Sequence, residues 1–245
     1  MTTIMLLLAF VAHPLPPAVQ TNLADRAHEH FRAGMNALAT ERYETAETEF
    51  KNAVQIDPLH DAAFYGLGQV YMATKRYPEA VKAYQDSRAA FLTGIAAEKL
   101  DAAASDRRVR DQLQVAKEYG RTLQRMSAST TPTLAAAIER NREDVRQLEA
   151  RLNKATGGAS PPIPAGLSMA LGSAYYRTQN IEAAEREYVE AIKVSPKFGE
   201  AHNNLAVIYM ITGRLDLAEK EVALAEQSGF KVNPKLKDDL KSRRQ

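Results

Sequence analysis

The stretch LGSAYYRTQNIEAAEREY, residues 171–188, contains the pattern on which the fold depends. A Leu-Gly pair ending at Gly172 is followed by Tyr175, and then by Ala184 and Tyr188. The stretch has no His or Cys, and its single glycine is not part of a phosphate-binding loop. Packing between helices, or recognition of a partner, therefore explains this spacing better than catalysis does.

The same pattern recurs in three other windows of the chain, at residues 32–50, 66–84 and 204–222. In the four windows, the small residue that follows the first apolar one falls at positions 34, 68, 172 and 206. Positions 34 and 68 are 34 residues apart, and so are positions 172 and 206. Several offsets that recur together in four windows indicate an internal structural repeat.

This pattern resembles the tetratricopeptide repeat (TPR), a 34-residue helix–turn–helix unit with an aromatic residue, Leu-Gly, Tyr, Ala and Pro at fixed offsets. The resemblance covers residues 27–94 and 165–232, two units in each range. Three units depart from the opening aromatic residue of the family and have His30, Ser168 or His202 there. The resemblance implies an all-α, right-handed α-solenoid, because each unit leaves an apolar face that a neighbour must cover.

Small residues at fixed positions indicate where the two helices of a unit approach closely. Gly68 and Gly172 occupy this position on the first helices. The matching small residues on the second helices are Ala46, Ala80, Ala184 and Ala218. A larger side chain at any of these positions is expected to overpack the helix crossing.

Residues 95–156 interrupt the repeat. They lack its Leu-Gly, Tyr and Ala-aromatic pattern and are rich in charged, helix-forming residues. Coiled-coil a and d positions are held by four apolar residues and one amide, namely Ile138, Asn141, Val145, Leu148 and Leu152. We predict a long, coiled-coil-like helical hairpin, followed by a Gly/Pro linker at residues 157–164. The alternative is two degenerate repeats, since the insertion has close to the length of two units.

The two ends of the chain need separate interpretations. Residues 1–26 combine an apolar run at 4–12 with a Pro-rich linker, and the run has the length of a signal-peptide core. This predicts a periplasmic or secreted protein. The alternative is an apolar tail on a cytoplasmic protein, because no Lys or Arg precedes the run. Residues 233–245 are expected to form a capping helix whose Leu236 and Leu240 cover the last unit.

The composition of the 245-residue chain argues against several classes of function. A net charge of +2, from 32 basic and 30 acidic residues, gives no electrostatic case for nucleic-acid binding. The absence of Cys excludes disulfides and thiolate chemistry. His28 and His30 point to different sides of a helix, which does not suit a metal site. We expect no enzymatic activity, no cofactor, no metal and no transmembrane span.

In the family, the first helices of successive units line a concave groove that holds a peptide or a partner helix. By repeat phase, the resemblance places eleven residues in this groove: Phe31, Met35, Tyr65, Gln69, Met72, Met169, Ser173, Tyr176, Asn203, Asn204 and Val207. The alternative for these side chains is packing between units, or against the N-terminal tail or the hairpin.

The function expected from this resemblance is protein–protein interaction, by an adaptor or assembly factor that binds a peptide or helix of another protein. The alternative is a structural protein that forms homo-oligomers through the hairpin at residues 95–156.

Overall fold

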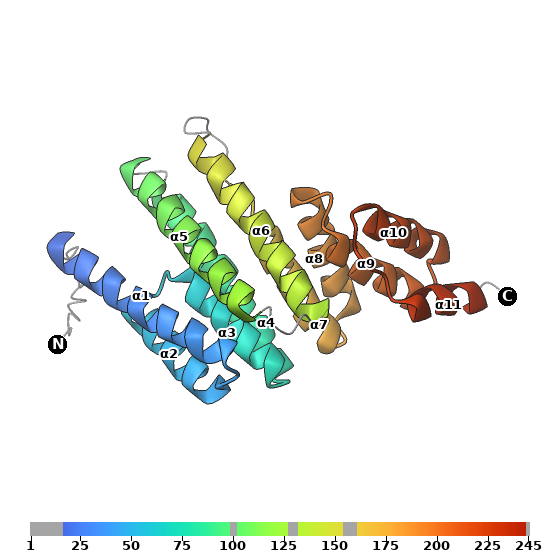
Figure 1. The fold of residues 1–245 in the computed structure, drawn as a ribbon, viewed down its shortest axis with the longest axis horizontal. Coiled ribbons are helices and arrows are strands. Elements are labelled where there is room, and N and C mark those ends of the chain that lie inside the picture. Colours follow the sequence, from blue (N-terminus) through green and yellow to red (C-terminus); the bar gives the residue numbers. More distant parts are fainter. Residues whose placement is uncertain (1–16, 99–101, 127–131, 154–160, 244–245) are drawn as a thin grey trace, which may run out of the picture.

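The protein is described from a computed structural model, which covers residues 17–98, 102–126, 132–153 and 161–243 (Figure 1). All regular structure in these ranges is α-helical. The first two repeat units are α1 (Pro17–Ala39) with α2 (Tyr43–Ile56) and α3 (Asp61–Ala73) with α4 (Tyr77–Glu98). The other two are α7 (Ala165–Arg177) with α8 (Ile181–Val194) and α9 (Gly199–Ile211) with α10 (Leu215–Gln227). The remaining helices are α5 (Ala102–Met126), α6 (Pro132–Asn153) and α11 (Pro234–Arg243).

The repeat helices stack in sequence into the all-α solenoid that the repeats predict. Each helix contacts the next one along the chain, and α4 in addition packs directly on α7, the first helix after the insertion. The second unit therefore stacks on the third although residues 99–164 separate them in the sequence. In the ranges described, no helix has both the length and the apolar character that crossing a membrane requires.

The turn inside each unit has the same backbone conformation. One residue of each turn has a positive φ, and these residues are 34 positions apart within each pair of units: Glu41 (56°), Lys75 (62°), Gln179 (62°) and Gly213 (77°). Three of the four units thus place a residue with a side chain in the left-handed region, which glycine occupies at lower cost.

The cores of the first three units depend on a small residue facing a ring. A Cβ atom on Gly68 would lie 2.4 Å from Cε1 of Tyr84, and one on Gly172 would lie 2.8 Å from Cε1 of Tyr188. In the fourth unit, the equivalent pair is Ala206 with Val222, both buried in one cluster. The smaller Val222 leaves room for the methyl group of Ala206, so the two positions compensate in volume.

The helices α5 and α6 run in opposite directions beside one another, in front of the repeat helices in the view of Figure 1. Arg151 Nη1 donates to Gln112 Oε1 at 3.4 Å, and Asn141 Nδ2 donates to the Ala116 carbonyl at 2.8 Å. Asn141 is buried at the interface, where a Cβ atom on Gly120 would lie 2.4 Å from its Oδ1. These helices have 25 and 22 residues, against 13 or 14 in α7 to α10.

Several predicted boundaries fall partly outside the described residues. These include the apolar run at 4–12, the turn between α5 and α6, and the first half of the linker at 157–164. The structure begins α1 at Pro17, inside the predicted N-terminal segment, and continues α4 to Glu98, beyond the predicted end of the second unit. At the C-terminus, Leu236 and Leu240 of α11 are buried with Val222 of the last unit.

Candidate functional site: the first-helix face and the helix pair on it

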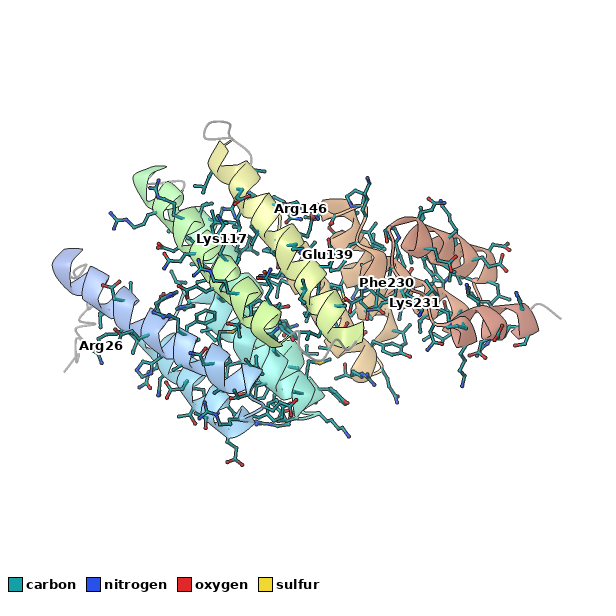
Figure 2. The ribbon with its side chains drawn as sticks, viewed as in Figure 1. Arg26, Lys117, Glu139, Arg146, Phe230 and Lys231 are labelled. Atoms are coloured by element: carbon teal, nitrogen blue, oxygen red, sulfur yellow. The ribbon has the colours of Figure 1, made fainter. Side chains whose placement is uncertain are left out.

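All eleven predicted groove residues lie on α1, α3, α7 and α9. We call the surface that these four helices form the first-helix face, and we call α5 with α6 the helix pair. The helix pair lies on this face, and its Lys117, Glu139 and Arg146 are exposed on the outward side (Figure 2). The structure therefore places part of the chain itself on the surface that the resemblance assigns to the groove.

The α5 helix contacts α1 and α3 through polar groups. Arg32 Nε of α1 lies 3.5 Å from Glu118 Oε2, and Gln112 Nε2 donates to Asp61 Oδ2 of α3 at 3.3 Å. Arg108 Nη2 lies 3.7 Å from the same Asp61 oxygen. Apolar side chains of α5 also contribute, because Val115 packs on the core cluster of the first three units and Val109 and Leu123 are buried.

Tyrosines occupy the centre of the contact between the helix pair and the first-helix face. The Tyr119 hydroxyl of α5 forms a hydrogen bond with the Gln69 side chain of α3. The Tyr65 and Tyr84 rings lie next to this pair, with their centroids 5.3 Å apart. Burial raises the pKa of all three phenols above the ordinary value, so they remain neutral and contribute ring surface and hydroxyl dipoles.

The α6 helix contacts α7 and α9 through two charged residues. Arg140 forms an ion pair with Glu200 of α9, and the two side chains are 23% and 22% exposed. Burial lowers the pKa of the Arg140 guanidinium, but the attraction of Glu200 more than offsets this effect. Asp144 Cγ lies 4.0 Å from the place that a Cβ on Gly166 of α7 would occupy. Burial raises the pKa of Asp144 to about 7, although the charge of Arg140 opposes the shift.

The predicted groove residues fall into two groups. In the first group, Phe31 and Met169 are each only 5% exposed, and Gln69 and Tyr65 face the helix pair. Asn204 is also used internally, because its Nδ2 donates to the Met169 sulfur at 3.5 Å. The second group is half-buried and comprises Met35, Met72, Ser173, Tyr176, Asn203 and Val207.

The repeat pattern did not identify Asp61, Tyr119, Arg140, Asp144 or Glu200, which hold the helix pair on the first-helix face. One signal was available in the sequence. Asp61 and Glu200 are acidic residues at the starts of first helices that are otherwise mostly apolar, and each of them receives a basic side chain from the insertion.

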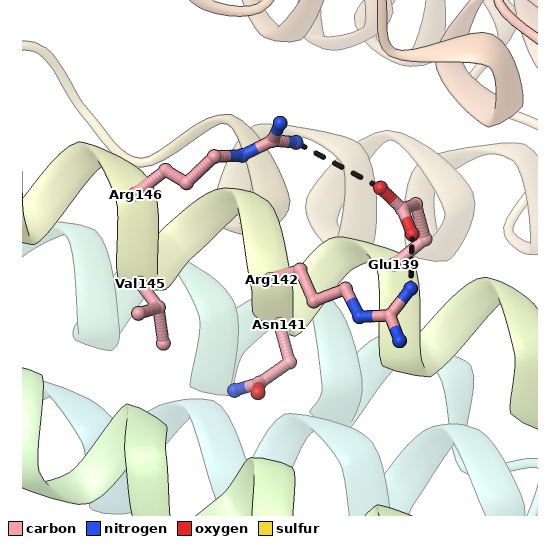
Figure 3. Close-up of a pocket in the computed structure, with 5 residues that line it drawn as sticks. All are labelled: Glu139, Asn141, Arg142, Val145 and Arg146. Atoms are coloured by element: carbon pink, nitrogen blue, oxygen red, sulfur yellow. Dashed lines mark hydrogen bonds and ion pairs between the residues drawn. The ribbon is translucent and has the colours of Figure 1, made fainter.

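An open, shallow pocket lies along α6, on the side of Glu139, Arg142 and Arg146 (Figure 3). Its charges pair with one another. Arg142 Nη1 lies 3.2 Å from Glu139 Oε2, and Arg146 Nη2 lies 2.6 Å from Glu143 Oε2. The pocket is thus lined by a self-neutralised helix surface and lacks an acid, base or nucleophile free for catalysis.

Two histidines form equivalent pairs in the first and fourth units. His30 Nδ1 lies 2.7 Å from Glu49 Oε2, and His202 Nδ1 lies 2.5 Å from Glu221 Oε2. Across the described ranges, no three His, Asp or Glu side chains are grouped in a way that could hold a metal ion. These histidines pair the two helices of one unit, as their shared repeat position indicates.

Among solved structures, the chain is similar to Pseudomonas aeruginosa PilF, with 14% identity, 91% of this chain and 90% of that chain covered, and a TM-score of 0.38. It is also similar to PilW, a type IV pilus biogenesis factor, with 15% identity, coverages of 86% and 80%, and a TM-score of 0.39. For YrrB, a TPR protein with an unusual peptide-binding site, the identity is 16%, the coverages are 93% and 96%, and the TM-score is 0.33.

No curated protein sequence matches the chain. A family model, described as the tetratricopeptide repeat, matches residues 31–91 and 169–231, which together make up half of the chain. These ranges overlap all four helix–turn–helix units of the solenoid, beginning within α1 and within α7, and they leave out the helix pair. The chain therefore belongs to the tetratricopeptide repeat family.

Proposed function

We propose that the chain is a non-enzymatic adaptor or assembly factor, and that it binds a peptide or helix of another protein on the part of the first-helix face formed by α7 and α9. One observation carries this proposal. Ser173, Tyr176, Asn203 and Val207 are half-buried on these two helices, and the contacts described for them are with the repeats themselves.

The chemistry of these four side chains suits a protein segment. Tyr176 and Val207 offer apolar surface, and the Asn203 amide can donate and accept hydrogen bonds at the same time, as an extended backbone requires. The Asn204–Met169 contact joins α9 to α7, so the four side chains are presented by a rigid pair of helices. With no charge among them, the surface favours an apolar or neutral segment.

Two features support a binding role over a catalytic one. The tyrosines at the centre of the contact are neutral, and the charged side chains around them pair with each other. The TPR family in general acts as a scaffold for other proteins. The alternative proposal, self-association through the helix pair, would use its exposed outward side.

The test is site-specific photo-crosslinking in the native cell, with a photoreactive residue at Val207. The control carries the same residue at Glu190, which is exposed on α8. A partner captured from position 207 alone is then purified and titrated against wild type, against a Tyr176→Glu/Asn203→Ala variant, and against Glu190→Ala. We expect at least tenfold weaker binding for the double variant only. Equal binding by all three proteins would refute this surface as the docking site.

The alternative proposal, self-association, is tested by measuring the molecular mass of the same proteins by light scattering at several concentrations. A mass that rises with concentration, and that falls in a variant with charge reversals at Lys117 and Arg146, would favour self-association.

We also propose export from the cytoplasm, because the N-terminal segment has the length of a signal peptide. N-terminal sequencing of the protein isolated from its native cell tests this, since an unprocessed Met1 would contradict cleavage.

A further inference from the structure

We infer that the helix pair is an internal ligand of the first-helix face, and that a partner helix with basic side chains facing Asp61 and Glu200 can displace it. This inference goes beyond the proposed function, because it concerns the part of the face over α1, α3 and the starts of α7 and α9. It adds a second binding surface, and the chain covers that surface with its own residues.

The first argument is that the solenoid is complete without the helix pair. The α4 helix packs directly on α7, and their contact is closed by Gln85 Nε2, which donates to the Tyr175 hydroxyl at 2.7 Å. Arg88 of α4 reaches Glu187 of α8 across the same junction. Since none of these residues belongs to α5 or α6, the helix pair can leave the face while the repeats stay stacked.

The second argument comes from the chemistry of the interface. The helix pair is held by ion pairs and side-chain hydrogen bonds, through Arg32, Asp61, Gln69 and Glu200 of the repeats, together with buried tyrosine rings. Polar links of this kind are exchangeable, because another helix that carries the same groups can form them in place of the helix pair. The cores of the repeats, by contrast, are formed by buried apolar side chains that belong mostly to the repeat helices themselves.

The third argument is charge complementarity, which defines the occupant. The face presents two carboxylates at the starts of its helices, Asp61 on α3 and Glu200 on α9, and the helix pair supplies Arg108 and Arg140 to them. A helix that replaces the pair needs a basic side chain at the same place, and an aromatic or apolar side chain near Tyr65. The α6 helix, which carries Arg140, is the template for the part of such a partner that faces Glu200.

A reversible lock tests the inference. The sequence has no cysteine, so an introduced pair is the only thiol pair in the chain. Asp144 Cγ, whose place a cysteine sulfur would take, lies 4.0 Å from the Cβ position of Gly166, so the two introduced side chains would be in contact, as a disulfide requires. In the full-length Asp144→Cys/Gly166→Cys variant, oxidation ties α6 to α7, and reduction releases it.

The probe is a fluorescein-labelled synthetic peptide of residues 132–153, titrated by fluorescence anisotropy. We expect the reduced variant to bind it at least tenfold more tightly than the oxidised form. Full-length Arg140→Glu should bind the same peptide at least threefold more tightly than wild type, because the peptide restores the arginine that Glu200 has lost. A peptide with the Arg140→Glu change is the matched control and should bind more weakly to every form.

Hydrogen exchange on the wild-type chain is the second readout, and it requires no peptide. Amides of residues 108–123 and 134–152 should exchange at least tenfold faster than those of α8, because the helix pair opens while the repeats stay folded. Equal exchange in the two regions, or equal peptide binding by the oxidised and reduced forms, would overturn the inference. The docking surface on α7 and α9 lies outside the lock, so crosslinking at Val207 tests the proposed function independently.

Discussion

Arg88 of α4 and Glu187 of α8 are 99 residues apart in the sequence, yet they form a two-pronged ion pair in which Arg88 Nη1 donates to Glu187 Oε1 at 2.8 Å. Within each uninterrupted pair of units, the junction has a different bond. There, an arginine pairs with a glutamate 29 residues earlier, in Arg76–Glu47 and Arg214–Glu185. The equivalent residues at the interrupted junction are Asn180 and Val81, which cannot form an ion pair. Arg88 and Glu187 thus replace this bond at the junction that the insertion interrupts.

Replacing Arg88 by Ala should weaken that junction. Glu187 is only 9% exposed, and losing the guanidinium leaves a nearly buried carboxylate without its charge partner. We expect the free energy of unfolding to fall by about 2–4 kcal/mol, measured by urea denaturation with circular dichroism. Lys82→Ala is the control, since Lys82 pairs with Asp86 on the exposed side of the same helix and should cost about 0.5 kcal/mol or less. Equal effects of the two changes would contradict this role.

A methyl group at Gly172 should overpack the third unit. Its Cβ would approach Cε1 of the buried Tyr188 to 2.8 Å, and we expect Gly172→Ala to cost about 1–3 kcal/mol. Because the fourth unit pairs Ala206 with Val222, the double change Gly172→Ala/Tyr188→Val should be less destabilising than the sum of its single changes. Gly166→Ala is the matched control, since its Cβ meets nothing closer than 3.5 Å. Additive effects in urea denaturation would show that the pair does not compensate.

Substitutions at the positive-φ turn position should change stability in opposite directions in the third and fourth units. Gly213 has φ of 77°, and its Cβ position is open, so Gly213→Ala would be strained by the backbone alone. We expect a loss of about 1 kcal/mol. Gln179 occupies the equivalent position with φ of 62°, and Gln179→Gly should therefore leave stability unchanged or raise it by up to about 1 kcal/mol. Thermal melts compare the two variants, and destabilisation by Gln179→Gly would reject this explanation.

His202 should make the fourth unit more stable at lower pH. Burial by itself lowers the pKa of His202. The hydrogen bonds of its two ring nitrogens to Glu221 and to the Pro196 carbonyl have the larger, opposite effect, so the pKa lies above its ordinary value. The folded state thus holds the proton more tightly than the unfolded state. Its contribution is fully present below the unfolded pKa of about 6.5 and is lost as pH rises through the higher folded pKa.

The measurement for His202 compares wild type with His202→Asn by urea denaturation at pH 5.5 and pH 9. We expect the difference in the free energy of unfolding to shrink at pH 9. The control is His30→Asn, because His30 has the equivalent glutamate at 2.7 Å but is 35% exposed. Its effect should be smaller at both pH values. A difference for His202→Asn that is constant with pH would contradict the protonated state.

Ionisation of Asp144 should destabilise the folded protein as pH rises, which is the opposite of the effect of a carboxylate whose pKa is lowered in the folded state. Its folded pKa of about 7 is raised by burial, so the folded state binds a proton that the unfolded state releases near pH 4. Stability from this group is therefore lost as pH rises from about 4 to about 7. We expect Asp144→Asn to match wild type near pH 4 and to be more stable at pH 8, in urea denaturation. A less stable Asp144→Asn at pH 8 would show that the ionised carboxylate is needed.

Much of the architecture could be predicted from local spacing. The small residue and the ring that faces it, such as Gly172 and Tyr188, lie in one short stretch, so their offset is visible in the sequence. The same holds for the turn positions at 34-residue intervals. The helical character of α5 and α6, and the amide at Asn141 among apolar a and d positions, also follow from periodicity, because a helix repeats its surface every 3.6 residues.

The sequence by itself determined the repeat, its period and the side of each first helix that the resemblance assigns to the groove, because those properties depend on residues close together in the chain. Only the tertiary structure decided what lies on that side. Arg140 and Glu200 are 60 residues apart with no periodic relation, and they meet because α4 packs on α7 and the insertion folds back over the repeats. An amphipathic helix shows that it must bury a face, but the surface that buries it is selected by the packing of the whole chain.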